Sequence, residues 1–172
     1  SSTEFTITRF LVPHLNKFAG WAVFCDCDMV WRCNPKELFD QVDDSKAVMV
    51  VKHEYNVSQG TKMDGQAQLP YPRKNWSSMI LWNCSHPKNK ALDLQTVNTA
   101  SPSFLHRFEW LDDTDIGTLN HSWNWLVGWY DVERDGDPKI IHYTEGGPWF
   151  EETRHCEFGH IWKQELINLY SS

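Results

Sequence analysis

The sequence has no long hydrophobic run and no surplus of positive charge. Its apolar stretches are short, and none approaches the roughly 20 residues that a membrane-spanning helix needs. Acidic residues outnumber basic ones by 23 to 16, which gives a net charge of −7. Broad nucleic-acid binding needs a cationic face. We therefore expect neither a membrane span nor a nucleic-acid partner, while the oligomeric state stays open.

The cysteines do not form a pattern typical of disulfides or zinc. There are five, an odd number, which argues against a complete disulfide framework. No Cys-x2-Cys pair occurs, so a zinc site is a weak alternative. No signal peptide is visible before the polar start at residues 1–4. We interpret the cysteines as small core residues of a cytoplasmic protein. They are Cys25, Cys27, Cys33, Cys84 and Cys156.

Several common catalytic and phosphate-binding motifs are also missing. The chain shows no Ser-His-Asp order, no Cys-His pair and no Gly-rich loop of the Rossmann or Walker type. Its 172 residues favour one domain over residues 1–172. The ten tryptophans exceed what such a core needs. They predict either a groove in which rings stack on sugars or bases, or an irregular core.

Strands are expected to alternate with helices, which predicts a layered α/β domain. The segment His53–Asn75 holds few apolar residues and is expected to be a long surface loop. The predicted helices span Phe5–Phe18, Asn34 to Phe39 or Val42, Lys88–Thr99, Pro102–Phe108 and Phe158–Tyr170. The predicted strands span Trp21–Cys25, Lys46–Lys52, Ser78–Asn83, Trp123–Trp129 and Lys139–Thr144.

Two carboxylates stand at the end of the first predicted strand. The apolar run Trp21–Cys25, which we expect to be buried on both faces, leads directly into Asp26 and Asp28. Buried carboxylates lose hydration at a large cost unless a cation balances them. The pair is therefore a candidate site for Mg²⁺ or Mn²⁺. The alternatives are a solvated strand end or a helix cap, and two carboxylates this close do not suit a glycosidase.

Other polar residues follow or precede predicted strands. His142 ends a hydrophobic strand and could complete a carboxylate metal site, although a lone histidine is often structural. Gly147 lies in a glycine pair that could cradle a phosphate or only form a tight turn. Asn75 and Ser77 could contact a sugar, or Asn75 could simply mark a turn. Asp115 lies in an acidic stretch and is a candidate for a residue near a reacting centre, although an acidic loop is usually only solvated.

Taken together and in this order, these motifs resemble a GT-A glycosyltransferase of the glycogenin-like family 8 group and its bacterial relatives. The resemblance runs through most of the chain. The motifs that carry it are residues 8–13, the Asp-x-Asp stretch 24–29, residues 75–78 with 81–83, and residues 140–144 with 147–149.

The resemblance implies an α/β fold with a mixed central sheet and flanking helices. It also implies a nucleotide-sugar donor, usually a UDP-sugar, and Mn²⁺ or Mg²⁺ on the diphosphate. Asp26, Asp28 and His142 would hold the metal, with Asp26 nearer the nucleotide ribose. Asn75 and Ser77 would face the sugar, and Gly147 would lie by the diphosphate.

The sequence departs from the family pattern in two places. The late glycine stretch lacks the lysine that relatives place near the diphosphate, so Arg9, Arg73 or Lys74 would share that charge. The family's N-terminal nucleotide-binding strands have no counterpart before Ser1, which predicts a truncated or degenerate member. The first hypothesis is a metal-dependent glycosyltransferase acting on a hydroxyl acceptor. The alternatives are a non-catalytic sugar- or nucleotide-binding module and, third, a phosphotransferase or nucleotidyltransferase.

Overall fold

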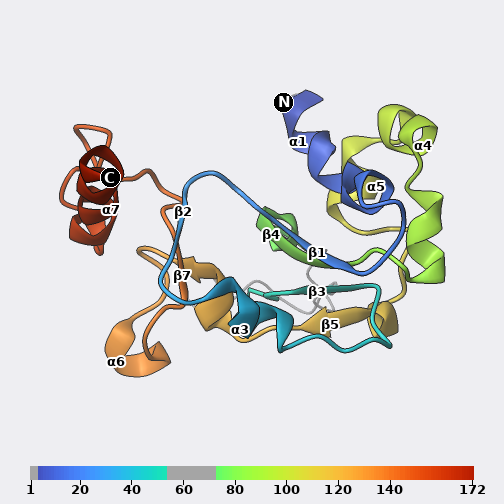
Figure 1. The fold of residues 1–172 in the computed structure, drawn as a ribbon, viewed down its shortest axis with the longest axis horizontal. Coiled ribbons are helices and arrows are strands. Elements are labelled where there is room, and N and C mark those ends of the chain that lie inside the picture. Colours follow the sequence, from blue (N-terminus) through green and yellow to red (C-terminus); the bar gives the residue numbers. More distant parts are fainter. Residues whose placement is uncertain (1–3, 54–72) are drawn as a thin grey trace, which may run out of the picture. The chain divides into compact units, whose positions relative to one another are not determined.

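The computed structural model describes residues 4–53 and 73–172, and Figure 1 shows its elements. The chain divides into two compact units. The first unit contains residues 1–24 and 43–119, and the second contains residues 25–42 and 120–172. Most of the loop predicted over His53–Asn75 lies outside the described residues, and the single-domain interpretation stays a prediction.

A four-stranded mixed sheet forms the centre of the first unit. Its strands are β1 (Trp21–Cys25), β3 (Val48–Val50), β4 (Met79–Asn83) and β5 (Ile116–Thr118), in the order β1-β4-β3-β5. β3 pairs antiparallel with β4 and parallel with β5. Every residue of β3 and β4 is buried, whereas all five residues of β1 are half-buried. The expectation that β1 is buried on both faces was therefore wrong, because β1 lies at the edge of the sheet.

The N-terminal helix is broken into three short pieces. They are α1 (Glu4–Ile7), the 3₁₀ helix η1 (Thr8–Leu11) and α2 (Val12–Leu15). Pro13 is accommodated in the first turn of α2, where its missing N–H costs nothing. The predicted helix over Phe5–Phe18 was wrong at its end, because Lys17 and Phe18 adopt positive φ angles of 53° and 52°. This turn reverses the chain toward β1.

Short helices with clear caps complete the first unit. The segment predicted as one helix over Lys88–Thr99 is split, because Asp93 accepts the N–H of Thr96 at 2.7 Å and starts a new helix there. Ser101 caps the next helix in the same way. The helices are η2 (Trp76–Ser78), η3 (Pro87–Ala91), α4 (Leu94–Thr99), α5 (Pro102–His106) and η4 (Asp113–Asp115).

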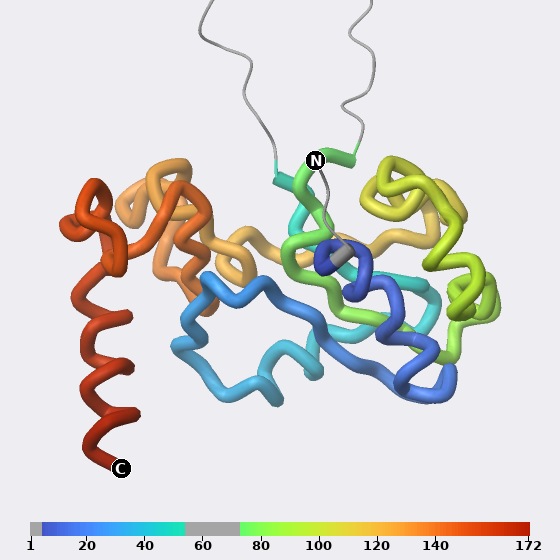
Figure 2. Tube along the Cα trace, turned by 90° about the horizontal axis from the view of Figure 1, so that it is seen from above, coloured from blue at the N-terminus to red at the C-terminus, as the bar shows by residue number. Residues whose placement is uncertain are grey.

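A three-stranded sheet organises the second unit. Its strands are β2 (Met29–Trp31), β7 (Ile140–His142) and β6 (Trp125–Leu126), in the order β2-β7-β6. β7 runs antiparallel to β2 and parallel to β6. The helices are α3 (Pro35–Phe39), η5 (His121–Asn124), α6 (Val132–Asp135) and α7 (Gly159–Ser171). α7 is one continuous helix that leads to the C terminus (Figure 2).

The sequence predictions for the second unit were only partly right. The helix over Phe158–Tyr170 is confirmed as α7, and its first turn packs Ile161 and Trp162 against a core of Val127, Ile141 and Tyr143. The later apolar side chains of α7 remain exposed, including Ile167 at 57%. The strand predicted over Trp123–Trp129 was mostly wrong.

The first part of that predicted strand is helical. Asn120 accepts the N–H of Ser122 at 2.9 Å and starts η5, which leaves only Trp125–Leu126 as the strand β6.

The cysteine thiols are all free. Cys84 is a buried core residue, as expected, but Cys27 is exposed, so the interpretation of Cys27 as a core residue was wrong. Cys27 lies in the turn between β1 and β2, where its side chain has no core to enter. Among the described residues, no helix is long and apolar enough to cross a membrane.

Candidate metal centre

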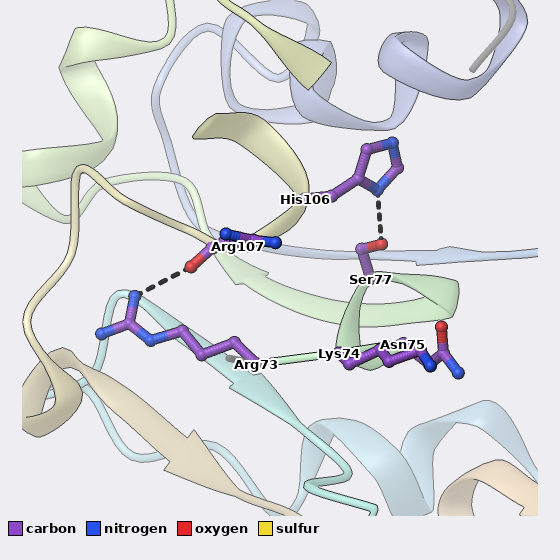
Figure 3. Close-up of a pocket in the computed structure, with 6 residues that line it drawn as sticks. All are labelled: Arg73, Lys74, Asn75, Ser77, His106 and Arg107. Carbon is purple, nitrogen blue, oxygen red and sulfur yellow. Dashed lines mark hydrogen bonds between the residues drawn. The ribbon is translucent and has the colours of Figure 1, made fainter. Parts of the chain in front are cut away.

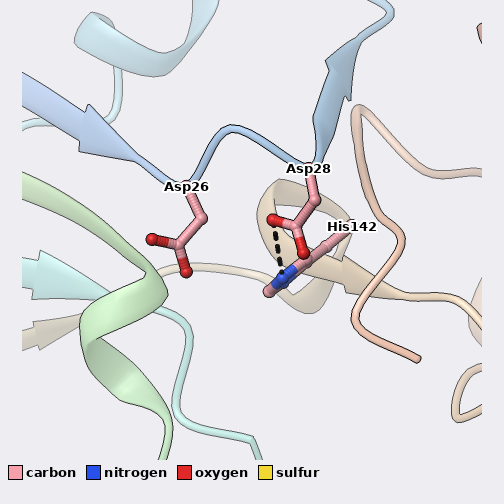
Figure 4. A group of neighbouring side chains, drawn as sticks. All are labelled: Asp26, Asp28 and His142. Carbon is pink, nitrogen blue, oxygen red and sulfur yellow. Dashed lines mark ion pairs between the residues drawn. The ribbon is translucent and has the colours of Figure 1, made fainter. Parts of the chain in front are cut away.

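Asp26 and Asp28 lie in the short link between β1 and β2 (Figure 4). The link is fixed to β7 through the backbone, because the carbonyl of Asp28 accepts the N–H of Tyr143 at 3.0 Å. The next residue, Met29, lies directly opposite His142 in the antiparallel pair of β2 and β7. The pairing of two strands that are distant in sequence therefore places His142 beside the two carboxylates.

The three side chains converge on one point. One ligand atom from each of Asp26, Asp28 and His142 lies within 4.8 Å of the others. His142 Nε2 lies 3.3 Å from Asp28 Oδ1. His142 is buried, while both aspartates are half-buried. The cluster is thus open enough for a ligand to reach the carboxylates and closed enough to weaken their hydration.

Asn124 determines which nitrogen of His142 faces the carboxylates. The Oδ1 of Asn124 lies 2.9 Å from His142 Nδ1. An amide oxygen can only accept, so Nδ1 carries a proton and donates it to Asn124. In the neutral ring, Nε2 then holds a lone pair that points at the carboxylates. This arrangement is typical of metal-binding histidines, whose second nitrogen is held by a hydrogen bond.

Sequence reasoning missed Asn124. The residue is fully buried at the end of η5, between Trp123 and Trp125. A buried amide must find hydrogen-bond partners, so an asparagine between two large apolar residues carried a usable signal. The sequence does not indicate that His142 is the partner of Asn124, because only the fold brings β7 beside Asn124.

The donor set fits a divalent metal of the type that the sequence predicts. Two carboxylates and one imidazole nitrogen suit Mn²⁺, and carboxylates with water suit Mg²⁺. With His142 neutral, the cluster carries the charge of two carboxylates, which a divalent cation would balance. The residues present therefore fit the metal.

Gly147 is also in the second unit, but it is buried. The ring of Trp149 lies so close that any Cβ at position 147 would overlap it. The carbonyl of Gly147 accepts a hydrogen bond from Thr153 Oγ1 at 2.7 Å. The close packing of the Trp149 ring thus explains why position 147 is a glycine. Its expected position beside a diphosphate stays a prediction.

Asn75 and Ser77 lie together in a pocket of the first unit (Figure 3). Asn75 adopts the left-handed conformation, with φ of 63°, directly before η2. Ser77 is 6% exposed, and its Oγ lies 2.7 Å from His106 Nδ1. Its carbonyl accepts from the Arg9 guanidinium at 2.7 Å. The structure brings the two predicted sugar-contact residues together, and those contacts stay a prediction.

Asp115 has a structural role in the first unit. Its carboxylate accepts the N–H of Asp112 at 2.8 Å, which completes a capping box around η4. The same carboxylate forms an ion pair with Lys88. These contacts give Asp115 a structural role that requires no catalytic function. Its placement near a reacting centre stays a prediction.

Comparison with known proteins shows what this chain is similar to. No protein-family model matches it. It is 52% identical over 168 residues to Protein CDI of Arabidopsis thaliana, an alignment that covers 96% of this chain and 65% of that protein. The chain thus spans about two thirds of the length of this curated relative.

Solved glycosyltransferases share the fold. The apo structure of the bifunctional glycosyltransferase WbbM matches with a TM-score of 0.66 and 20% identity, over 93% of this chain and 35% of WbbM. The glycosyltransferase GlyE of Streptococcus pneumoniae TIGR4 matches with a TM-score of 0.59 and 14% identity, over 95% of this chain and 43% of GlyE. The chain therefore has a mixed α/β fold shared with glycosyltransferases, and the fold class expected from the sequence is confirmed.

Proposed function

We propose that this chain carries the metal-binding part of a GT-A glycosyltransferase of the glycogenin-like type. The enzyme would move a sugar from a nucleotide-sugar, most simply a UDP-sugar, to a hydroxyl acceptor. Mn²⁺ or Mg²⁺ would be held by Asp26, Asp28 and His142. The observation that carries the proposal is the convergence of these three ligand atoms within 4.8 Å, in a fold shared with glycosyltransferases.

The chain's own residues prepare the site for a cation. Strand pairing fixes the Asp28 backbone against Tyr143, so the residue is held directly before β2. Asn124 keeps the Nδ1 proton of His142 and leaves Nε2 as the acceptor. When bound, the metal supplies positive charge that stabilises the departing diphosphate.

The remaining assignments rest on the sequence resemblance. Asn75 and Ser77 are proposed to contact the sugar, and their position in a polar pocket supports this role. Gly147 is proposed to lie by the diphosphate, and Asp115 near the reacting centre. The capping box and ion pair of Asp115 make it the weakest of these assignments.

The proposal is tested by calorimetric titration of UDP into the full chain, with and without Mn²⁺. We expect UDP to bind only when Mn²⁺ is present, and Asp28→Ala to abolish that metal-dependent binding. Asp137→Ala is a matched control, since Asp137 is an exposed aspartate of the same unit. Absence of metal-dependent binding at millimolar UDP in the unsubstituted chain would contradict the proposal.

The same preparation separates the proposed enzyme from its alternatives. Transfer or hydrolysis of UDP-sugars by the Mn²⁺-loaded chain is the result expected for a glycosyltransferase. Metal-dependent UDP binding without any turnover would instead support a non-catalytic binding module. Turnover of nucleoside triphosphates alone would support a phosphotransferase or nucleotidyltransferase.

A further inference from the structure

The polar cavity of the first unit that holds Asn75 and Ser77 is formed by chain segments that precede β4 and that end α5. Its volume is about 310 Å³, which is within the range for small-molecule sites. We call it the Arg107 pocket. Its lining residues are Arg73, Lys74, Asn75, Ser77, His106 and Arg107, drawn in Figure 3.

The charge of the Arg107 pocket is opposite to that of the whole chain. Three of its described lining residues are cationic and none is acidic, although the chain carries a net charge of −7. Lys74 and Arg107 are exposed. A concave site lined by one sign of charge concentrates ligands of the opposite sign. The pocket therefore favours an anion.

Arg73 does not supply the binding charge, because it is used to hold the pocket together. Its guanidinium donates to the carbonyls of Arg107, Phe108 and Leu111 at 2.6–3.0 Å. It also pairs with Asp113 Oδ1 at 2.7 Å. These bonds fix the backbone that follows α5.

The side chain of Arg107 remains available. Its guanidinium makes no hydrogen bond or ion pair within residues 4–53 and 73–172, while its carbonyl is held by Arg73. A planar guanidinium matches the geometry of a carboxylate or phosphate and can bind either through two parallel hydrogen bonds. Arg107 is thus a cation presented on a fixed backbone.

The other lining residues of the pocket are polar but neutral. Ser77 and His106 are joined by a hydrogen bond of 2.7 Å. Burial and the nearby Arg9 guanidinium hold the pKa of His106 below its usual value, which keeps the ring uncharged at neutral pH. Asn75 adds an exposed amide. Imidazole, hydroxyl and amide groups together offer both donors and acceptors, which suits a ligand with several hydroxyls.

We propose that the Arg107 pocket binds a small hydroxylated molecule that carries one carboxylate or phosphate group, such as a uronic acid or a sugar phosphate. Arg107 binds the anionic group, with Lys74 adding to the positive potential. The Asn75, Ser77 and His106 side binds hydroxyls. Asn75 and Ser77 are the residues proposed above to contact the donor sugar, so this inference rests in part on the proposed function. The test contains no divalent metal, so its failure is distinguishable from a failure of the metal site at Asp26, Asp28 and His142.

The test is a calorimetric titration of the full chain in buffer without divalent metal. The probes are glucuronate, glucose 6-phosphate, neutral glucose and inorganic phosphate. We expect glucuronate or glucose 6-phosphate to bind at least tenfold more tightly than both glucose and inorganic phosphate. The probe that binds identifies the anionic group as carboxylate or phosphate.

Two variants assign the binding to the pocket. Arg107→Gln is expected to weaken the sugar-acid or sugar-phosphate affinity at least tenfold, whereas Lys90→Gln, the same charge change at an exposed lysine of the same unit, leaves it unchanged. Equal melting temperatures would show that Arg107→Gln is folded. The proposal is overturned if neither charged sugar binds more tightly than glucose and phosphate. It is also overturned if Arg107→Gln binds as the unsubstituted chain does.

Discussion

At the scale of single residues, the chemistry of the candidate metal centre depends on one buried amide. His142 can offer a lone pair to a cation only through the nitrogen that carries no proton. Asn124 holds the proton on Nδ1 and so directs Nε2 toward Asp28. We therefore regard Asn124 as a positioning residue that acts through His142.

Replacing Asn124 should lower the affinity for metal only if the new side chain lacks an oxygen that can accept the proton of His142 Nδ1. Asn124→Ala removes the partner of Nδ1, and loss of such an outer partner typically costs 10–100-fold in metal affinity. Asn124→Asp retains an acceptor oxygen and should stay within a few-fold of the unsubstituted chain. Mn²⁺ titration calorimetry measures both. Equal affinity for Asn124→Ala, or equal losses in the two variants, would contradict this role.

The half-buried position of His106 predicts a pH dependence of stability. Its pKa is lowered by burial and by Arg9, so the unfolded chain takes up this proton at a higher pH than the folded chain. Below about pH 6.5, the ordinary value for histidine, the unfolded state binds more protons and the free energy of unfolding falls. The fall continues until the pH reaches the lowered pKa of the folded state.

His106→Gln removes this titration and should flatten part of the decline between pH 7 and pH 5. Urea unfolding at several pH values, followed in parallel for the two chains, measures the difference in slope. His14→Gln is a suitable control, because His14 is an exposed histidine of the same unit. Parallel pH profiles for His106→Gln and the unsubstituted chain would show that His106 does not stay neutral on folding.

At the scale of elements, longer patterns were predictable and the shortest strands were not. α3 and α7 follow from a capping Asn34 and from helical spacing over a dozen residues. β2, β5 and β6 contain only two or three residues. Segments this short cannot show the alternation of apolar and polar residues by which a strand is predicted. Lys17 and Phe18 adopt the left-handed backbone conformation although neither is a glycine. The residue types at these two positions therefore did not predict the turn.

The candidate site was predictable where a motif ends a strand. Asp26 and Asp28 follow an apolar run, and His142 ends another, so the sequence alone is enough to predict that they meet. Asn124 was not predictable as their partner, because only the pairing of β6 with β7 brings η5 beside His142. The sequence also did not show that the carboxylate of Asp115 takes part in a capping box at η4.

Packing around the loop after β7 predicts a strong effect at Gly147. Any Cβ at this position overlaps the ring of Trp149, so Gly147→Ala must displace that ring. Overpacking of this kind costs about 1–3 kcal/mol. Denaturant unfolding of Gly147→Ala should show this loss.

A second substitution isolates the cause. In a Trp149→Ala background the obstacle is gone, and Gly147→Ala should then cost much less. The double-mutant cycle therefore predicts a favourable coupling between the two changes of about the same size. Additive effects would mean that the glycine is needed for another reason, such as the hydrogen bond from Thr153.

At the scale of the whole molecule, the proposed chemistry is divided between two compact units. The three candidate metal ligands belong to the second unit, whereas Asn75, Ser77 and Asp115 belong to the first. Metal binding and pocket binding can therefore be measured separately on the same chain. The comparisons support the fold as a whole, because the match to WbbM covers 93% of this chain.

The central claim is that Asp26, Asp28 and His142 form a metal site, and Mn²⁺ binding in the absence of nucleotide tests it most directly. Electron paramagnetic resonance of free Mn²⁺ gives the bound fraction during a titration of the full chain. The account predicts one site, weakened at least tenfold by Asp28→Asn and by His142→Ala and unchanged by Asp137→Asn. Equal Mn²⁺ binding by the unsubstituted chain and Asp28→Asn would contradict it.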